Sequence, residues 1–196
     1  MGRETIGIDV DEVLYPFLSG FINHHNGQYG TDHKFHEFKS YHFEQALGIE
    51  VPEVVRRVYE YTELDDLHIE PIEESQAAIR SLAQKFDLAI ITSRHEKYKE
   101  RTLRYLTHYY GPAFAGLHTV GYEKIMKNPV TKASVCRAIG ARAMIDDTLG
   151  HVVECAAQGI EGVLFGDYPW NSGEVPAGIV RCLSWPQVLK HFNVES

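Results

Sequence analysis

The stretch Thr5-Ile6-Gly7-Ile8-Asp9-Val10-Asp11 decides the fold class, because a short apolar run ends there in two carboxylates. Thr5–Val10 has the composition of a buried strand. Four further buried strands are predicted at Asp87–Thr92, Leu117–Val120, Ala143–Ile145 and Gly162–Phe165. Helical patterns lie between the later strands, at His95–Tyr110, Thr131–Ile139 and His151–Gln158, and a glycine follows each of them. Alternation of strand and helix predicts an α/β fold of three layers, with a parallel sheet between helices.

One long segment interrupts this alternation. About seventy-five residues separate the first strand from the strand at Asp87, far more than a simple crossover needs. Helices are predicted at Tyr15–Asn26, Val51–Tyr61 and Ile72–Gln84, with a glycine-rich turn at Gly27–Gly30. The last of these helices can serve as the crossover of the core. The sequence therefore predicts a core domain of residues 1–14 and 71–196, with an inserted helical cap at residues 15–70.

Composition limits the class of partner and the compartment. Nineteen basic and twenty-seven acidic residues give a net charge of −8, which disfavours binding to a nucleic acid polymer. No apolar run approaches the length of a membrane span, and no membrane partner or targeting segment is expected. The three cysteines form no CxxC pair and suit a reducing compartment. We therefore expect a cytoplasmic protein, and the sequence leaves the oligomeric state, including a homodimer, open.

Polar residues follow three of the predicted strands. The first ends in Asp9-Val10-Asp11, the second in Thr92-Ser93-Arg94, and a later one in Asp146-Asp147. The carboxyl ends of parallel strands lie along one edge of a sheet, where ligands bind. Lys132 joins this group if it opens the helix that leads into the Asp146 strand, where a cation and a helix amino end would both face an anion.

Four carboxylates at one edge repel one another unless a cation offsets their charge. Oxygen ligands without histidine or cysteine suit Mg²⁺ rather than zinc. A metal ion together with Lys132 and the Thr92 hydroxyl forms a site for a tetrahedral dianion, and phosphate is the natural ligand. Asp9 and Asp11 can then act separately, one as a nucleophile and the other as a general acid.

Four sets of residues resemble, in order, the motifs of the haloacid dehalogenase-like hydrolase superfamily: Asp9-Val10-Asp11, Ile90-Ile91-Thr92, Lys132 and Ile145-Asp146-Asp147. More narrowly, three features resemble the 5′(3′)-deoxyribonucleotidase group and its uncharacterised relatives. These are the spacing of Lys132 from the aspartate pair, the turn at Tyr110-Gly111-Pro112, and the segment Tyr168-Pro169-Trp170-Asn171. The resemblance implies a Rossmann-like parallel core with an inserted cap.

The resemblance also implies roles for the carboxylates. Asp9 would attack phosphorus and become an aspartyl-phosphate, and Asp11 would protonate the leaving oxygen and then activate water. Asp9, Asp146 and the backbone carbonyl of Asp11 would hold Mg²⁺, with Asp147 in the outer shell. The implied activity is hydrolysis of a phosphomonoester of a small metabolite, such as a nucleoside monophosphate.

Thr92, Ser93 and Lys132 are the implied phosphate-binding residues. Two departures from the family pattern lie beside the site: Glu12 stands where many members have glycine, and Arg94 stands where the compared nucleotidases have proline. Both bear on the substrate more than on the chemistry. Arg94 is open to two interpretations, a contact to substrate or a surface ion pair.

Other functions remain in competition. A sugar phosphatase or a phosphotransferase is the nearest alternative, and a catalytically idle binding protein of the same fold is the second. A dehalogenase is disfavoured, because a carbon–halogen substrate needs no acid such as Asp11 for its leaving group. Five histidines in the cap, at positions 24, 25, 33, 36 and 42, make a zinc site conceivable there but follow no regular spacing. Ten aromatic residues in the cap are expected to form mainly its own core, with one or two facing substrate.

Overall fold

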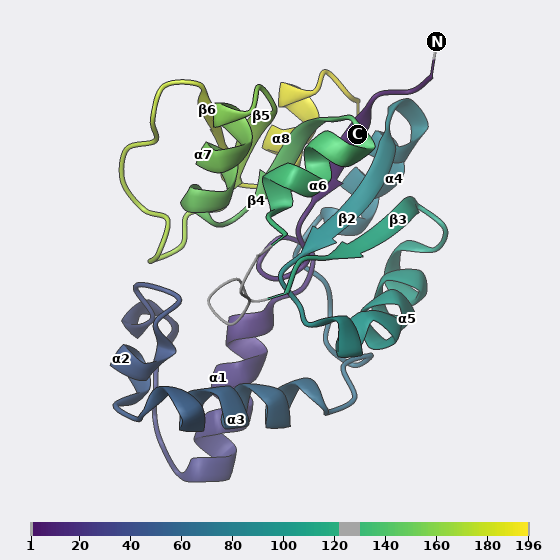
Figure 1. The fold of residues 1–196 in the computed structure, drawn as a ribbon. Coiled ribbons are helices and arrows are strands. Elements are labelled where there is room, and N and C mark those ends of the chain that lie inside the picture. Colours follow the sequence, from purple (N-terminus) through teal and green to yellow (C-terminus); the bar gives the residue numbers. More distant parts are fainter. Residues whose placement is uncertain (1, 122–129, 196) are drawn as a thin grey trace.

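The computed structural model describes residues 2–121 and 130–195 and contains one six-stranded parallel sheet in the order β3-β2-β1-β4-β5-β6 (Figure 1). The strands are β1 Thr5–Ile8, β2 Asp87–Thr92, β3 Phe114–Thr119, β4 Ala141–Asp146, β5 Glu161–Phe165 and β6 Ile179–Cys182. Strand β1 lies in the interior of the sheet, between β2 and β4. The predicted site residues of these three strands therefore come from adjacent strand ends.

Helices cover both faces of this sheet. The described helices are α1 Phe17–Tyr29, α2 Phe43–Leu47, α3 Val51–Thr62, α4 Ser75–Lys85, α5 Lys99–Tyr110, α6 Lys132–Ile139, α7 Leu149–Ala157 and α8 Trp185–His191. Two short 3₁₀ helices are η1 Phe35–Glu37 and η2 Glu96–Tyr98. Helices α6 and α7 pack together on one face, and α4 packs with α5 and α8 on the other. The predicted three-layer α/β fold is confirmed. None of the described helices is both long and apolar enough to cross a membrane.

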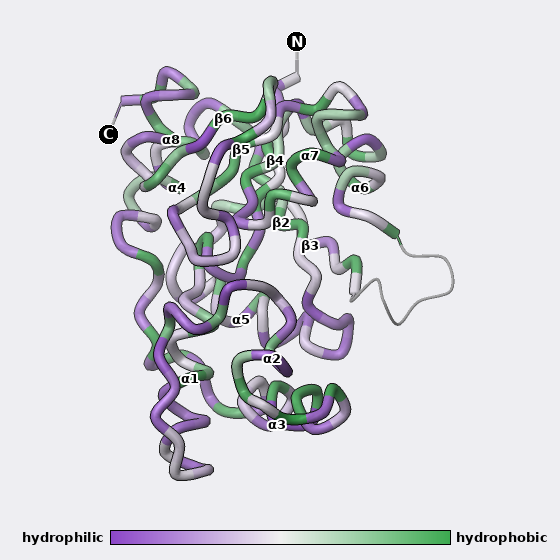
Figure 2. Tube along the Cα trace, turned by 90° about the vertical axis from the view of Figure 1, so that its left-hand side faces the viewer, coloured by the Kyte–Doolittle hydropathy of each residue, from purple (hydrophilic) through white to green (hydrophobic). Residues whose placement is uncertain are grey.

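The alternation of side chains along the strands builds two core layers. Ile6, Ile8 and Ile90 pack into the cluster beneath α4, α5 and α8, whereas Ile91 and Met144 pack against α6 and α7. Figure 2 shows the green, hydrophobic stretches of the strands gathered in the upper part of the molecule, among helices and loops that carry much of the purple. Burial of these runs on both faces explains why they lack the polar alternation of a half-exposed strand. All three cysteines are free and buried.

Several element boundaries differ from the prediction. Strand β3 begins at Phe114 rather than Leu117, because Phe114 pairs with Leu88 of β2. The start of the turn predicted at Gly27–Gly30 is wrong, because α1 runs through the exposed Gly27 and ends at Tyr29. Gly30 follows the helix with a φ of +63°, a conformation that commonly ends a helix. Strand β6 and helix α8 were not predicted, since they are short and rest on contacts with β5 and α4.

Helices α1, α2 and α3 occupy the segment between β1 and α4 and lie together on one side of the core (Figure 1). They share a small apolar cluster that includes Phe21, Phe38 and Tyr61. Aromatic residues of this segment thus pack mainly against one another, as expected. The domain boundaries at residues 15 and 70 stay a prediction. Both termini lie at the opposite end of the molecule from these helices in Figures 1 and 2.

Candidate active site

Asp9 follows the last residue of β1 and remains in register with the sheet, since its N–H donates to Ile145 O at 3.0 Å. The chain then turns sharply after Val10, whose carbonyl accepts hydrogen bonds from Leu14 and Tyr15, both at 2.8 Å. Asp9 therefore belongs to the strand end, whereas Asp11 belongs to the turn. This local geometry separates two carboxylates that are only two residues apart in sequence.

Lys132 connects the ends of β1 and β4. Its Nζ lies 2.7 Å from Asp146 Oδ2 and 2.9 Å from Asp9 Oδ1, and its side chain is 1% exposed. Lys132 is the first residue of α6, which begins with a capping box: Thr131 Oγ1 accepts from Ser134 N, and Ser134 Oγ accepts from Thr131 N. The helix amino end thus faces the carboxylates, as the sequence predicted.

The charges of this group are strongly coupled. The pKa of Asp9 is raised to about 6, mainly by burial. The charge of Lys132 lowers this pKa, and the charge of Asp146 raises it further. Burial alone would raise the pKa of Asp146, but Lys132 and His151 outweigh it and hold that pKa below its ordinary value. Burial disfavours the ammonium of Lys132, yet Asp146 and Asp9 outweigh burial and raise its pKa. At neutral pH the group therefore contains a lysine cation and two carboxylates.

Asp147 completes the buried cluster and is held by aromatic donors. Trp170 Nε1 donates to Asp147 Oδ2 at 2.7 Å, and the Tyr41 hydroxyl, from the segment between η1 and α2, donates to the same oxygen. Asn171 Nδ2 donates to the Asp147 backbone carbonyl at 2.8 Å. Burial, followed by the charges of Asp146 and Asp9, raises the pKa of Asp147 well above its ordinary value.

A divalent cation fits this donor set. One carboxylate oxygen from each of Asp9, Asp146 and Asp147 lies within 4.8 Å of the other two. Oxygens on opposite sides of Mg²⁺ are about 4.2 Å apart, so small side-chain movements bring this set to bonding distance. Asp9 Oδ1 is buried and has no hydrogen-bond partner among the described residues, although Lys132 Nζ lies 2.9 Å away. The metal-binding role predicted for Asp11 concerns its backbone carbonyl and stays a prediction.

Thr92, Ser93 and Arg94 lie at the end of β2, beside β1. Thr92 is fully buried, Ser93 is half-buried, and Thr92 Oγ1 accepts from Arg94 N at 3.2 Å. The Arg94 guanidinium turns toward Asp11, with Nη2 2.7 Å from Asp11 Oδ1. The structure thus places the predicted residues in two adjoining groups, one around Lys132 and one around Arg94.

Glu12 stands at the position where many members of the superfamily have glycine, and its φ is +59°. Its buried carboxylate accepts from Leu18 N at 2.5 Å, in the first turn of α1. Burial raises the pKa of Glu12 to about 8. The hydrogen bond from Leu18 lowers this pKa, whereas the charges of Asp11 and Asp9 raise it further. Glu12, which departs from the family pattern, therefore accepts a hydrogen bond from the first turn of α1.

Two residues at the site were missed by sequence reasoning. His151 Nδ1 lies 3.1 Å from Asp146 Oδ2, and the Tyr41 hydroxyl bonds Asp147. Burial disfavours the imidazolium of His151, but Asp146 outweighs burial and raises the pKa of His151. A local signal for His151 exists, since it lies in the first turn of the helix that follows the aspartate pair. Tyr41 has no such signal.

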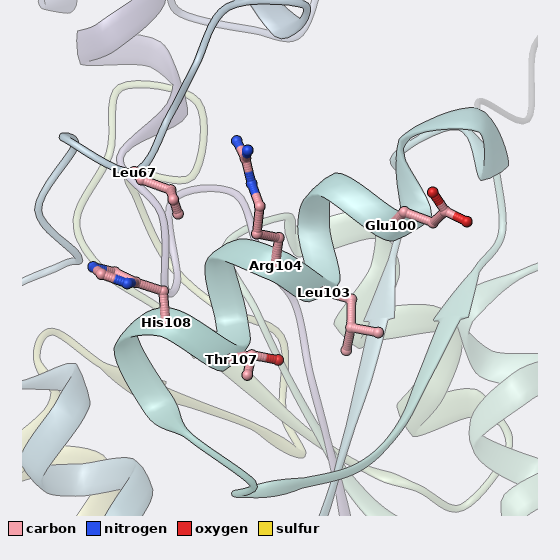
Figure 3. Close-up of a pocket in the computed structure, with 6 residues that line it drawn as sticks. All are labelled: Leu67, Glu100, Leu103, Arg104, Thr107 and His108. Atoms are coloured by element: carbon pink, nitrogen blue, oxygen red, sulfur yellow. The ribbon is translucent and has the colours of Figure 1, made fainter.

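Two surface hollows lie outside the carboxylate cluster. Figure 3 shows the first, on α5, lined by Leu67, Glu100, Leu103, Arg104, Thr107 and His108. None of the predicted site residues lines it, so its position gives no support for a catalytic role. The second, of about 510 Å³, lies between α1 and residues 61–70 and is lined in part by Tyr15 and Tyr61.

Comparison with known proteins supports one family. The model of the family described as 5′ nucleotidase, deoxy (pyrimidine), cytosolic type C protein matches residues 3–192. No curated protein gives a significant match.

Solved structures show the same fold at low sequence identity. A haloacid dehalogenase-like hydrolase from Streptococcus pneumoniae has a TM-score of 0.69 at 13% identity, over 97% of this chain and 98% of its own. A predicted phosphoglycolate phosphatase from Haemophilus somnus has a TM-score of 0.70 at 14% identity, over 97% and 98%. The HAD-hydrolase YfnB from Bacillus subtilis, bound to magnesium, has a TM-score of 0.67 at 14% identity, over 98% and 100%.

Proposed function

The chain belongs to the family of deoxy (pyrimidine) 5′ nucleotidases of cytosolic type C, and we propose that it hydrolyses nucleoside monophosphates with Mg²⁺ through an aspartyl-phosphate on Asp9. The coarser activity follows from the family: the protein is a phosphatase with a haloacid dehalogenase-like fold. One observation carries the finer proposal. Lys132 Nζ bridges Asp9 and Asp146 at the carboxyl edge of the sheet, with Asp147 beside them.

The first chemical step uses Asp9 and Asp11. A carboxylate oxygen of Asp9 bonds to phosphorus while the ester P–O bond breaks. The electron pair of the ester bond goes to the leaving oxygen. Asp11 gives its proton to that oxygen. In the second step Asp11 takes a proton from water, the water oxygen bonds to phosphorus, and the bond to Asp9 breaks. Phosphate leaves, and Asp9 is a carboxylate again.

The remaining residues bind and orient. Lys132 and the hydroxyls of Thr92 and Ser93 would hold phosphoryl oxygens. Asp9, Asp146 and the Asp11 carbonyl would hold Mg²⁺, with Asp147 in the outer shell, and the ion would offset the negative charge of the phosphoryl group.

A cluster of four aromatic rings supports a nucleotide as substrate. Tyr168 and Trp170 stack with centroids 4.9 Å apart, and Phe35 and Tyr41 lie 5.6 and 5.7 Å from Trp170. Trp170 also bonds Asp147, so the cluster adjoins the carboxylates. Flat aromatic faces suit stacking with a base. A cytoplasmic location and a small phosphorylated partner, without nucleic acid polymer or membrane, belong to the same proposal.

The test compares Asp9→Asn with the unchanged enzyme on p-nitrophenyl phosphate, with and without Mg²⁺. We expect Asp9→Asn to lose nearly all turnover at an unchanged melting temperature, and beryllofluoride to bind only the unchanged enzyme. Asp87→Asn, an exposed carboxylate at the far end of β2, is the control and should retain activity. Substantial turnover by folded Asp9→Asn protein would refute the nucleophile.

A panel of phosphomonoesters tests the substrate class. We expect deoxynucleoside 5′-monophosphates to be hydrolysed with a higher kcat/KM than sugar phosphates. The reverse order would favour a sugar phosphatase, and transfer of phosphate to an added alcohol in place of water would favour a phosphotransferase.

A further inference from the structure

Arg94 makes a forked ion pair with Asp11. Arg94 Nη2 lies 2.7 Å from Asp11 Oδ1, and Arg94 Nε lies 3.2 and 3.1 Å from Oδ1 and Oδ2. The side chain of Arg94 is only 9% exposed, and that of Asp11 is 31% exposed. The contact is thus an ion pair, as one of the two interpretations from the sequence has it, but a largely buried one rather than one at the surface. A forked guanidinium fixes a carboxylate in position and in rotation, which a point charge cannot do.

The guanidinium is itself held on two further sides. It stacks over the Tyr15 ring, with Cζ 4.7 Å from the ring centroid, and Nη1 donates to Thr102 Oγ1 at 3.2 Å. Thr102 is fully buried on α5, and the Tyr15 hydroxyl bonds the Tyr61 hydroxyl of α3 at 3.0 Å. The position of Arg94 is therefore determined by packing before any substrate binds.

Arg94 also contacts the residue predicted to bind phosphate. Its backbone N–H donates to Thr92 Oγ1 at 3.2 Å. A threonine hydroxyl has one proton and two acceptor sites, so a hydroxyl that accepts from Arg94 still has its proton to donate to a phosphoryl oxygen. Arg94 thereby links the orientation of the Thr92 hydroxyl to that of the Asp11 carboxylate.

We infer that Arg94 is a positioning residue for Asp11, which holds the general acid at the leaving oxygen without touching substrate. This inference rests on the proposed function, because it takes Asp11 as the acid. A carboxylate has about four lone-pair sites, and the fork takes both sites of Oδ1 and one of Oδ2. One site is left on Oδ2, for the proton that Asp11 gives to the leaving oxygen and later takes from water. Without the fork, Asp11 rotates freely about its two side-chain bonds, and misplacement by about 1 Å costs on the order of a hundredfold in rate.

The experiment measures KM and the rate at which the leaving group is released in a single turnover, which reports the first chemical step alone, for Arg94→Gln, Asp11→Asn and the double variant on two substrates. One is p-nitrophenyl phosphate, whose leaving group needs no proton. The other is thymidine 5′-monophosphate, or the fastest alkyl phosphate of the panel, whose alkoxide needs one. Arg142→Gln, which loses exposed ion pairs to Glu4 and Glu161, is the control and should match the unchanged enzyme.

We expect Arg94→Gln to lower this single-turnover rate on the alkyl phosphate by about a hundredfold and on p-nitrophenyl phosphate by less than about threefold. KM should change little on either. In the Asp11→Asn background, Arg94→Gln should cost no more than about twofold, because the acid that it positions is gone. Arg94→Lys should recover only part of the loss, since the ammonium cannot fork.

Two results would overturn the inference. Equal losses on both substrates, or an undiminished loss in the Asp11→Asn background, would mean that Arg94 acts on something other than Asp11. If Asp11→Asn itself lowers both substrates equally, the acid role in the proposed function fails, whatever Arg94 does. Should Arg94→Gln fail to fold by circular dichroism, Arg94→Lys keeps the charge and carries the same comparisons.

Discussion

The ammonium of Lys132 lies 2.7 Å from the carboxylate of Asp146, and both side chains are completely buried. The same nitrogen lies 2.9 Å from Asp9, so one cation offsets two carboxylates in the interior. Breaking a buried pair by removing one partner leaves an uncompensated charge, which costs far more than the pair itself contributes. Lys132 therefore has a structural role beside the phosphate-binding role that we propose for it.

Replacement of Lys132 by methionine should lower the free energy of unfolding by about 3–5 kcal/mol at pH 7 in the presence of a chelator. Urea denaturation measures this loss. Saturating Mg²⁺ should restore part of it, because a divalent cation can offset the same carboxylates. Lys190→Met, at an exposed position of α8, is the matched control and should stay within about 0.5 kcal/mol. A loss below about 1 kcal/mol for Lys132→Met would show that the two carboxylates are not both charged.

The carboxyl-edge group was predictable because topology alone determines it. Once the apolar runs form parallel strands, Asp9, Thr92 and Asp146 must end at one edge, and the helix opened by Lys132 must point its amino end there. The grouping needs only parallel strands and the direction of the helix, which the alternation of apolar runs and helical patterns predicts. Glu12 and Arg94 stood out for another reason, because the resemblance to the superfamily marked both as departures from its pattern.

Contacts between distant side chains were not predictable in this way. Arg94 and Asp11 are 83 residues apart, and Tyr41 and Asp147 are 106 apart. Each contact depends on side-chain rotamers and on how a loop packs against the core. The turn wrongly placed at Gly27–Gly30 has a related cause. Glycine permits a turn but does not require one, and α1 continues across Gly27 on its exposed side.

Binding of Mg²⁺ should release protons. The pKa of Asp9 is about 6, and that of Asp147 is raised well above its ordinary value, whereas a metal ion binds the carboxylate form. Affinity should therefore increase as the pH rises through 6, with release of up to about one proton from Asp9 below that pH. Calorimetric titration in buffers of different ionisation enthalpy measures the proton count. Affinity that is constant from pH 5.5 to 7.5 would show that Asp9 does not hold the ion.

His25 should make stability depend on pH. Arg57 Nη1 can only donate, so its 2.9 Å contact makes His25 Nε2 an acceptor, and Nδ1–H is left to donate to Thr31 Oγ1 at 3.0 Å. This network assigns a neutral imidazole. Burial, followed by the charge of Arg57, lowers the pKa of His25.

The sign of the effect follows from the lowered pKa. The unfolded chain binds a proton near pH 6.5 that the folded protein does not bind until lower pH, so stability falls as pH drops below about 6.5. The slope from this residue is at most about 1.4 kcal/mol per pH unit. Urea denaturation of His25→Gln between pH 7.5 and 5.5 should show a shallower fall than the unchanged protein. His36→Gln, at an exposed position, is the control, and identical slopes for all three proteins would contradict the assignment.

Trp170 should influence Mg²⁺ affinity without touching the ion. Its Nε1–H donates to Asp147 Oδ2 at 2.7 Å, and its ring stacks on Tyr168 with an interplanar angle of 10°. Trp170→Phe keeps a stacking ring but removes the donor. Loss of a hydrogen bond that orients a metal-site carboxylate typically costs about 10–100-fold in metal affinity or activity, so the Mg²⁺ concentration for half-maximal hydrolysis should rise by that factor. Turnover at saturating Mg²⁺ should fall much less.

The other tryptophan of the chain provides the matched control for this change. Trp185 Nε1 donates to Val13 O at 3.1 Å within the core, so Trp185→Phe also removes one indole hydrogen bond. It should cost about 1 kcal/mol of stability, while Mg²⁺ half-saturation stays within about twofold. Magnesium titration of hydrolysis and calorimetry of both variants separate the two effects. If Asp147→Asn weakens Mg²⁺ binding while Trp170→Phe leaves it unchanged, Asp147 is held in place by Tyr41 and Asn171 rather than by Trp170.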